Sequence, residues 1–212
     1  LVSLATTYLF HLGYSALLKA GYFPGHRVAI VGFGALGFCT SQLVHAFAGS
    51  PDVYSSIDKS RAETFLHAKI RAKVGQEAQY GKYDIVINTS DSWDDYLLSL
   101  ELLRVGGTCV LIGFPGRNLP KADFNPLDSR LLYDKQLQLK YAGYAPECDV
   151  AESDIRFTLK KNVQYLANLI LHNRLNTTPL TSLVRNWDEI TELYSALNQP
   201  EKKSLSGVLK WI

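Results

Sequence analysis

Short apolar runs of strand length alternate with amphipathic stretches over most of this chain. The apolar runs lie at 27–31, 53–57, 83–88, 108–114 and 136–144. Between them, apolar residues recur every three or four positions, which is typical of helices, at 36–47, about 60–72 and 92–104. A further helix is predicted over 3–20, and a short strand is expected near Ala78.

This alternation predicts an α/β fold built on a doubly wound parallel sheet. Parallel neighbours need crossover connections, which are right-handed and usually helical. The run Tyr83–Asn88 is apolar enough to be buried on both faces, as a central strand of such a sheet would be. We therefore expect a six-stranded parallel sheet with helices on both faces.

The helix over 92–104 has clear end signals in the sequence. Ser92 and Asp95 have the spacing of a capping box. Arg104 is expected in the last turn, and Gly106-Gly107 would end the helix.

The pattern changes after residue 145. Apolar residues at helical spacing predict a long amphipathic helix, and they are Ile155, Leu159, Val163, Leu166 and Ile170. A strand near 180–185, a helix opened by Asn186 and a last strand at 207–212 follow. We expect an α/β domain with a leading helix over 1–145, and a helix and strand segment over 146–212.

The turn after the first strand has the pattern Gly-x-Gly-x-x-Gly, with Gly32, Gly34 and Gly37. In a strand–turn–helix context these glycines permit a tight turn, close approach of a pyrophosphate, and close helix–strand packing. The helix N-terminus adds free N–H groups and a partial positive charge. We expect the three glycines, with the backbone of Ala35 and Leu36, to bind a dinucleotide pyrophosphate in a Rossmann fold. A glycine-rich turn without a ligand is the alternative.

The end of the second strand is expected to choose between the two nicotinamide cofactors. An acidic residue there bonds the adenosine ribose, whereas hydroxyls with nearby cations suit a 2′-phosphate. Asp58 at the strand end would select NAD(H). Ser55 or Ser56 there, with Lys59 and Arg61 behind, would select NADP(H). Counting from Gly37 slightly favours Ser56, because the equivalent position in the family that the chain resembles (described below) lies about that far along, so NADP(H) is slightly favoured.

Ligands of open parallel sheets bind outside the carboxyl ends of the strands. Two of these ends have been located in the sequence. The fourth strand ends at Asn88, Thr89 and Ser90, and the fifth ends at Ile112, Gly113 and Phe114.

Several landmarks occur in a fixed order around the glycine turn: Pro24-Gly25, Tyr-Asp-Ile-Val-Ile-Asn at 83–88, Arg-Val-Gly-Gly-Thr-Cys-Val-Leu-Ile-Gly at 104–113, Gly143, Asn-Trp-Asp-Glu-Ile-Thr-Glu-Leu-Tyr at 186–194 and Gly-Val-Leu-Lys at 207–210. This set resembles the medium-chain dehydrogenase/reductase superfamily, the alcohol-dehydrogenase-like enzymes. The resemblance covers nearly the whole chain.

The resemblance implies hydride transfer between NAD(P) and an alcohol, carbonyl or enone substrate. The nicotinamide and its ribose would lie at the ends of the fourth and fifth strands, with the backbone of Ile112 and Phe114 orienting the carboxamide. It also implies that this chain is the cofactor-binding portion with its returning tail, and that an N-terminal catalytic domain is absent. The catalytic residues are therefore unknown. A non-catalytic NAD(P)-binding sensor or interaction module is the alternative function.

Zinc is disfavoured for this chain. In zinc-dependent members of the superfamily, one ligand is a cysteine before the first Rossmann strand. An ungapped comparison places Thr7 near that position, with no Cys or acidic residue close by and only an isolated His11.

Composition and charge exclude several classes of partner. Lys and Arg are scattered and the net charge is +2, so no nucleic acid is expected. The apolar stretches are too short for a membrane span. Three cysteines without a Cys-x-x-Cys motif fit a reducing compartment, the cytoplasm. The chain lacks methionine, so it is expected to be processed or a piece of a longer protein.

Besides a small-molecule substrate, the expected partner is a second copy of the chain. The resemblance implies a homodimer through the sixth strand, 136–144, where Leu137, Leu139 and Tyr141 alternate. In the tail, we expect the segments around Leu183, Trp187 and Trp211 to leave apolar surface uncovered.

Overall fold

The computed structural model describes residues 2–55, 70–72, 78–117, 119–143, 157–199 and 204–211, with backbone only for 70–72. The chain divides into two compact units. One comprises Leu12–Ala145, and the other combines Leu1–His11 with Pro146–Ile212.

The larger unit contains a sheet of six strands in the order β3-β2-β1-β4-β5-β6. Every neighbouring pair is parallel. The strands are β1 (Val28–Val31), β2 (Asp52–Ser55), β3 (Ile70–Ala72), β4 (Tyr83–Asn88), β5 (Leu103–Leu111) and β6 (Gln138–Tyr141). This order, with β1 and β4 at the centre, confirms the doubly wound Rossmann-type sheet predicted from the sequence.

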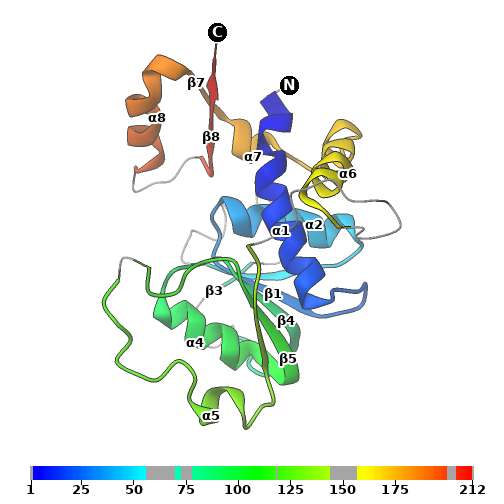
Figure 1. The fold of residues 1–212 in the computed structure, drawn as a ribbon, viewed down its shortest axis with the longest axis vertical. Helices are drawn as coiled ribbons and strands as arrows, with labels where there is room; N and C mark the ends of the chain where they lie inside the picture. The colour runs from blue at the N-terminus through cyan, green and yellow to red at the C-terminus, as the bar shows by residue number, and fades with distance from the viewer. Residues whose placement is uncertain are drawn as a thin grey trace. The chain divides into compact units, whose positions relative to one another are not determined.

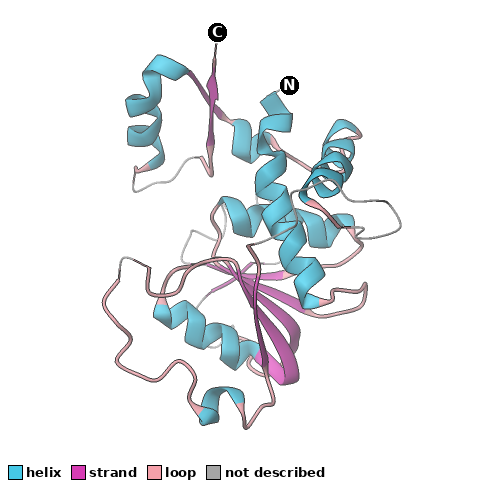
Figure 2. Cartoon of the chain, viewed as in Figure 1, coloured by secondary structure: helices cyan, strands magenta, loops and turns pink. Residues whose placement is uncertain are grey.

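Helices cover both faces of this sheet, as predicted. They are α2 (Ala35–Ala46) and α4 (Trp93–Leu102), and the short α5 (Ser129–Leu132) packs on α4. Of α1 (Thr7–Ala20), the part from Leu12 onward belongs to this unit. Figures 1 and 2 show α2 and α4 on opposite faces of the sheet. Across the described part of the chain, no helix combines the length and apolarity that crossing a membrane would need.

The core lies on both sides of the central strands. All four residues of β1 are buried, and β4 is buried except for Asp84. On one face, Ala29 and Val31 of β1 cluster with Tyr54, Tyr83 and side chains of α4. Burial on both faces explains why these strands are nearly continuous apolar runs.

The smaller unit has its own two-stranded parallel sheet, formed by β7 (Leu183–Asn186) and β8 (Gly207–Lys210). Its helices are η1 (Val2–Thr6), α6 (Leu159–Leu171), α7 (Thr178–Thr181), η2 (Trp187–Glu189) and α8 (Ile190–Leu197). The side chains of Asn186 and Glu189 form a capping box at the start of η2. The expected exposure is confirmed for Trp187 and Trp211, which are 48% and 76% exposed, whereas Leu183 is half-buried. The two tryptophan rings stack with centroids 5.7 Å apart.

Three local expectations were wrong. The third strand is Ile70–Ala72, not a segment near Ala78. These three residues were predicted as the end of the 60–72 helix, but they form a strand because they pair with β2. Arg104 lies in β5 rather than in a helix, since α4 ends at Leu102. Ser92 does precede α4, but its side chain makes no capping hydrogen bond.

Candidate functional site

The glycine turn lies beside the segment that follows β4. The Thr89 N–H donates to the Val31 carbonyl at 2.9 Å. The Thr89 hydroxyl reaches the carbonyls of Val31 and Gly32 at 3.1 and 3.3 Å. Since β1 and β4 are adjacent and parallel, their carboxyl ends form one edge of the sheet. Two of the predicted cofactor segments therefore meet at this edge.

Two of the three glycines are required by the fold itself. Gly32 has φ +97°, in the left-handed region that favours glycine. A Cβ on Gly32 would lie 2.6 Å from the Thr89 hydroxyl oxygen. A Cβ on Gly37 would lie 2.2 Å from the carbonyl oxygen of Gly32, so only glycine allows α2 to approach the turn this closely.

Gly34 is different, because neither packing nor backbone conformation requires a glycine there. Its φ is −89°, which any residue adopts, and among the described atoms a Cβ would meet nothing within 4 Å. Gly34 is the N-cap of α2, and no side chain caps the helix. The N–H groups of the first turn, including those of Ala35 and Leu36, have no acceptor within the helix. The turn thus presents bare backbone and free N–H groups in front of α2.

Asn88 ties the end of β4 to its surroundings. Its side chain is fully buried, accepts from the Ser90 N–H at 2.8 Å and donates to the Ser99 hydroxyl at 3.0 Å. Its carbonyl accepts from the N–H groups of Ile112 and Gly113 at 2.9 and 3.2 Å. Asn88 therefore acts by holding Ser90 and the end of β5 in place, while its own side chain faces the interior.

The segments after β4 and β5 touch each other. A Cβ on Gly113 would lie 2.2 Å from the carbonyl oxygen of Ser90, so this contact needs glycine. Ile112 is buried, whereas Phe114 is 62% exposed. The Arg117 guanidinium lies over the Phe114 ring, 5.1 Å from its centroid. The predicted residues after β4 and β5 thus form one continuous surface at the carboxyl edge of the sheet.

The predicted cofactor-selecting segment is described only in part. β2 ends at Ser55, which is buried. The other residues of that prediction lie outside the described residues, and they are Ser56, Asp58, Lys59 and Arg61.

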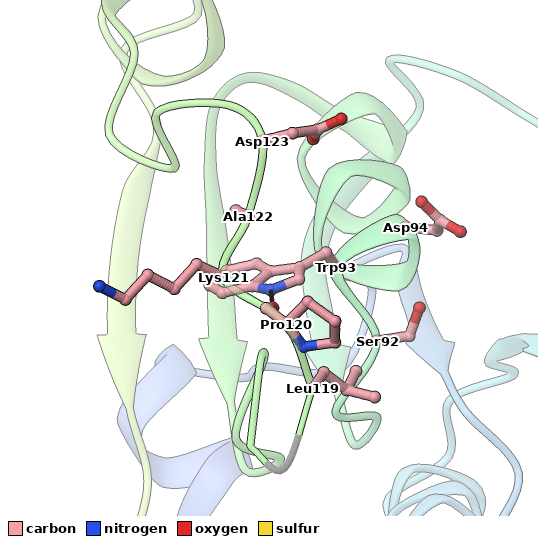
Figure 3. A pocket seen from close by; sticks show the side chains of 8 residues that line it. All are labelled: Ser92, Trp93, Asp94, Leu119, Pro120, Lys121, Ala122 and Asp123. Atoms are coloured by element: carbon pink, nitrogen blue, oxygen red, sulfur yellow. Dashed lines mark hydrogen bonds between the residues drawn. The ribbon is translucent and has the colours of Figure 1, made fainter.

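The loop after β5 packs on the start of α4 beside a cavity of about 360 Å³ (Figure 3), lined by Ser92, Trp93, Asp94 and residues 119–123. The Trp93 indole N–H donates to the Pro120 carbonyl at 3.2 Å. A Cβ on Gly116 would lie 2.4 Å from the Trp93 ring, so this glycine lets the loop close over the indole. These contacts hold the loop that continues from Phe114.

Sequence reasoning missed Tyr54, which contacts the glycine turn directly. Its carbonyl accepts from the Gly32 N–H at 2.9 Å. The only cue in the sequence was a tyrosine inside a short apolar run, and its contact with Gly32 depends on strand pairing.

The described residues near the glycine turn offer no reactive thiol or metal centre. Cys39 lies in α2, but burial raises the pKa of its thiol far above the usual range, so the reactive thiolate is suppressed. His11 of α1, which belongs to the smaller unit, is buried, and burial lowers its pKa. No group of three His, Cys, Asp or Glu side chains able to hold a metal occurs in the described part of the chain. The expectation of no zinc stays a prediction.

Comparison with known proteins yields no matching family model. A curated relative, the probable formaldehyde dehydrogenase AdhA of Bacillus subtilis, is 33% identical over 109 residues, which are 49% of this chain and 31% of AdhA. The L-idonate 5-dehydrogenase of Escherichia coli superposes with a TM-score of 0.76 at 18% identity, over 99% of this chain and 56% of that protein. The acetophenone reductase of Geotrichum candidum, solved in complex with NAD, superposes with a TM-score of 0.73 at 16% identity. The match covers 95% of this chain and 54% of that protein.

These comparisons define the class of protein that the chain resembles. At such low identities the solved structures establish the fold, a Rossmann-type dehydrogenase fold. The homologues and structural neighbours are medium-chain alcohol-dehydrogenase-like enzymes, which confirms the resemblance found in the sequence. The chain spans about half the length of the solved neighbours and a smaller share of the curated relative.

Proposed function

We propose that this chain binds a nicotinamide dinucleotide and forms the cofactor-binding part of an NAD(P)-dependent oxidoreductase of the alcohol-dehydrogenase type. The observation that carries the proposal is Gly34. Gly32 and Gly37 are glycines for reasons internal to the fold, but no described atom lies against the Cβ position of Gly34, in front of a helix N-terminus without a side-chain cap. A bound pyrophosphate explains the glycine at position 34. The pyrophosphate would accept hydrogen bonds from the free N–H groups, and it needs bare backbone to approach them.

The rest of the edge suits the remainder of the cofactor. Thr89 and Ser90 follow β4 and Phe114 follows β5, beside the glycine turn. We assign the nicotinamide and its ribose to these segments, with the backbone of Ile112 and Phe114 orienting the carboxamide. The cofactor, when bound, supplies hydride chemistry for an alcohol, carbonyl or enone substrate. This chain's own residues bind and orient the cofactor.

For the choice of cofactor we propose NADP(H). β2 ends at Ser55, which supports the alternative that places Ser55 and Ser56, rather than Asp58, at the strand end. Lys59 and Arg61 would then follow close behind, where cations suit a 2′-phosphate. Separate titrations with NADPH and NADH test this choice. Tighter binding of NADH would contradict it.

Substitution of Gly34 separates nucleotide binding from folding. Asp and Asn are both better N-caps than Gly by a few tenths of a kcal/mol, so Gly34→Asp and Gly34→Asn should melt at or above the wild-type temperature. Only Asp places a negative charge at the proposed phosphate position. We expect Gly34→Asp to bind NADPH at least about tenfold more weakly than Gly34→Asn, by calorimetric titration. Equal affinity in both variants and the wild type would overturn the proposal.

Turnover is a separate question from binding. It is tested with the natural full-length gene product, by following NADPH oxidation with a panel of aldehydes, ketones and enones. We expect at least one of these substrate classes to be reduced. Tight nucleotide binding without turnover on any of them would favour the alternative, a non-catalytic NAD(P)-binding sensor or interaction module.

A further inference from the structure

A pair of buried tyrosines links two strands that are not neighbours. Tyr54 is in β2 and Tyr83 is in β4, and β1 lies between them. Their hydroxyl oxygens are 2.9 Å apart and their rings are nearly perpendicular, with centroids 6.0 Å apart. Ala29 of β1 belongs to the same buried cluster. Its small side chain leaves room for the two rings to meet across the strand.

The hydroxyl of Tyr83 also bonds to the first residue of β2. It donates to Asp52 Oδ2 at 2.6 Å. A phenol has a single hydrogen, so Tyr83 accepts from Tyr54, whose oxygen in turn accepts from the Gln79 N–H at 3.2 Å. Burial, then the bonds to Asp52 and Tyr54, raise the pKa of Tyr83. The Tyr83 phenol therefore stays protonated. Each group then donates to the next, from the Gln79 N–H to the Tyr54 hydroxyl, to the Tyr83 hydroxyl and to the Asp52 carboxylate.

These side-chain bonds matter because β2 is held by short backbone ladders. β2 has four residues, and its pairings with β1 and β3 each align three residue pairs. The bond from Tyr83 to the Asp52 carboxylate joins a buried phenol to a partly buried charged acceptor, and hydrogen bonds to charged groups are stronger than neutral ones. Tyr83 thus ties β2 to the central strand β4 at two points, Asp52 and Tyr54.

The same Tyr54 also contacts the proposed cofactor site. Its carbonyl accepts from the Gly32 N–H at 2.9 Å, at the first glycine of the turn. The next residue, Ser55, ends β2 at the segment expected to select the cofactor. The residue whose hydroxyl is tied to β4 is therefore the residue whose backbone holds the glycine turn.

We propose that Tyr83 is a positioning residue for nucleotide binding: its hydroxyl holds β2 against β4 and so keeps the Tyr54 carbonyl on the Gly32 N–H. The importance of this role for the cofactor rests on the proposed function. Tyr83 touches neither the turn nor the proposed ligand position, and it acts through Asp52 and Tyr54.

The test compares Tyr83→Phe with Tyr96→Phe. Tyr96 is an equally buried tyrosine of the same cluster, and its hydroxyl donates to the Pro126 carbonyl at 2.7 Å rather than to β2. Tyr83→Phe loses two side-chain hydrogen bonds and Tyr96→Phe loses one. A purely structural role predicts that both variants lose stability without a selective change at Gly32. The readout is hydrogen exchange of the Gly32 N–H, measured by NMR in the nucleotide-free protein relative to the Ile87 amide of β4.

We expect Tyr83→Phe to accelerate relative Gly32 exchange about fivefold, which corresponds to roughly one hydrogen bond, and Tyr96→Phe to leave it unchanged. NADPH affinity should fall by a similar factor in Tyr83→Phe only. Equal relative exchange in the two variants would overturn the proposal. If Tyr83→Phe does not fold, Tyr54→Phe decides, because it breaks the link to Tyr54 and keeps the Tyr83–Asp52 bond.

The two proposals fail in distinguishable ways. A wild-type chain that binds neither NADPH nor NADH contradicts the proposed function. Gly32 exchange in the free protein is measured without a nucleotide, so it supports or overturns the role of Tyr83 by itself.

Discussion

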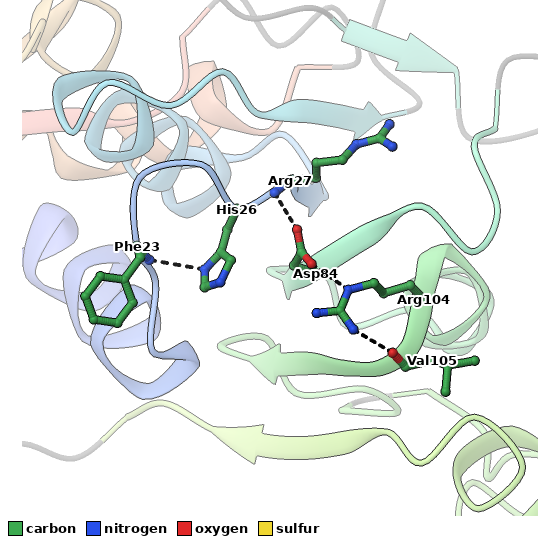
Figure 4. Close-up of polar contacts among 6 residues, drawn as sticks. All are labelled: Phe23, His26, Arg27, Asp84, Arg104 and Val105. Carbon is green, nitrogen blue, oxygen red and sulfur yellow. Dashed lines mark hydrogen bonds and ion pairs between the residues drawn. The ribbon is translucent and has the colours of Figure 1, made fainter.

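The carboxylate of Asp84 joins β4 to β5 through the side chain of Arg104 (Figure 4). Asp84 Oδ1 accepts from Arg104 Nε, and the other oxygen accepts from the Arg27 N–H at 2.7 Å. Arg104 also donates to the Val105 carbonyl at 2.7 Å. One carboxylate therefore fixes the amino ends of three adjacent strands, at the edge of the sheet opposite the proposed nucleotide site.

Loss of this carboxylate should destabilise the fold in a pH-dependent way. Burial alone would raise the pKa of Asp84, but the hydrogen bonds from Arg104 and Arg27 outweigh it and hold the pKa below its usual range. Because the folded-state pKa is depressed, the stabilisation is present above the unfolded pKa and is lost as the pH falls through the folded value. Asp84→Asn should cost about 1–2 kcal/mol in urea unfolding at pH 7, and less at pH 3.

Asp128→Asn is the matched control. Asp128 pairs with Arg130, two residues away at the start of the same short helix, so the pair joins no separate strands. The Arg130 side chain is 84% exposed. Asparagine also retains an oxygen that can cap α5. We expect the unfolding free energy to stay near wild type at pH 7. A loss as large as that of Asp84→Asn would contradict the assignment.

Alanine should destabilise the fold more at Gly37 than at Gly34. A Cβ on Gly37 would lie 2.2 Å from the Gly32 carbonyl oxygen, a contact that forces backbone to move. We expect Gly37→Ala to cost about 1–3 kcal/mol in unfolding free energy. Gly34→Ala should cost at most about 1 kcal/mol, because alanine is a poorer N-cap than glycine but reduces the freedom of the unfolded chain. Thermal and urea unfolding measure both. Similar losses in the two variants would show that Gly34 is also constrained by packing.

The parts of the fold that were predictable are those where local pattern and tertiary environment agree. β4 was predicted with its observed bounds, because a strand buried on both faces is a continuous apolar run. The glycine turn was equally clear, since the motif stands between a strand and a helix. Both features are written in consecutive residues.

The remaining features depend on pairing between distant segments. β3 contains Arg71 between Ile70 and Ala72 and has no strand pattern of its own, so it exists through its register with β2. Arg104 follows the helix pattern of α4, but β5 begins at Leu103 because that residue pairs with Tyr83. The hydrogen bond between the hydroxyls of Tyr54 and Tyr83 likewise could not be predicted, since only the strand order brings these two residues together.

Lys135 should stabilise the end of α4. Its ammonium donates to the carbonyls of Leu100 and Glu101 at 3.1 Å each and of Leu103 at 3.2 Å. Leu100 and Glu101 are in the last turn of α4, whose carbonyls have no acceptor role within the helix itself, and Leu103 follows the helix directly. A cation at this end also favours the helix dipole. Burial lowers the pKa of Lys135, and Glu101 opposes this.

Lys135→Gln is expected to cost about 1–2 kcal/mol in unfolding free energy, measured in urea at pH 7. Lys82→Gln is the control, because Lys82 is exposed in the turn before β4. The control should remain within about 0.5 kcal/mol of wild type. If both variants have the unfolding free energy of the wild type, the three hydrogen bonds of Lys135 make no net contribution to stability.

The last prediction concerns the free edge of β6. This strand ends the sheet, and among the described strands it pairs only with β5. Unpaired strand edges invite pairing with another chain, and we predict a homodimer in which β6 meets its symmetry mate across 136–144.

Tyr141 is 68% exposed on this strand, so Tyr141→Glu would place like charges near the two-fold axis. Tyr133→Glu, at a 72% exposed position before β6, is the control. Sedimentation velocity should show a dimer for the wild type and the control, and a monomer for Tyr141→Glu. A wild-type monomer at micromolar concentration would refute the interface.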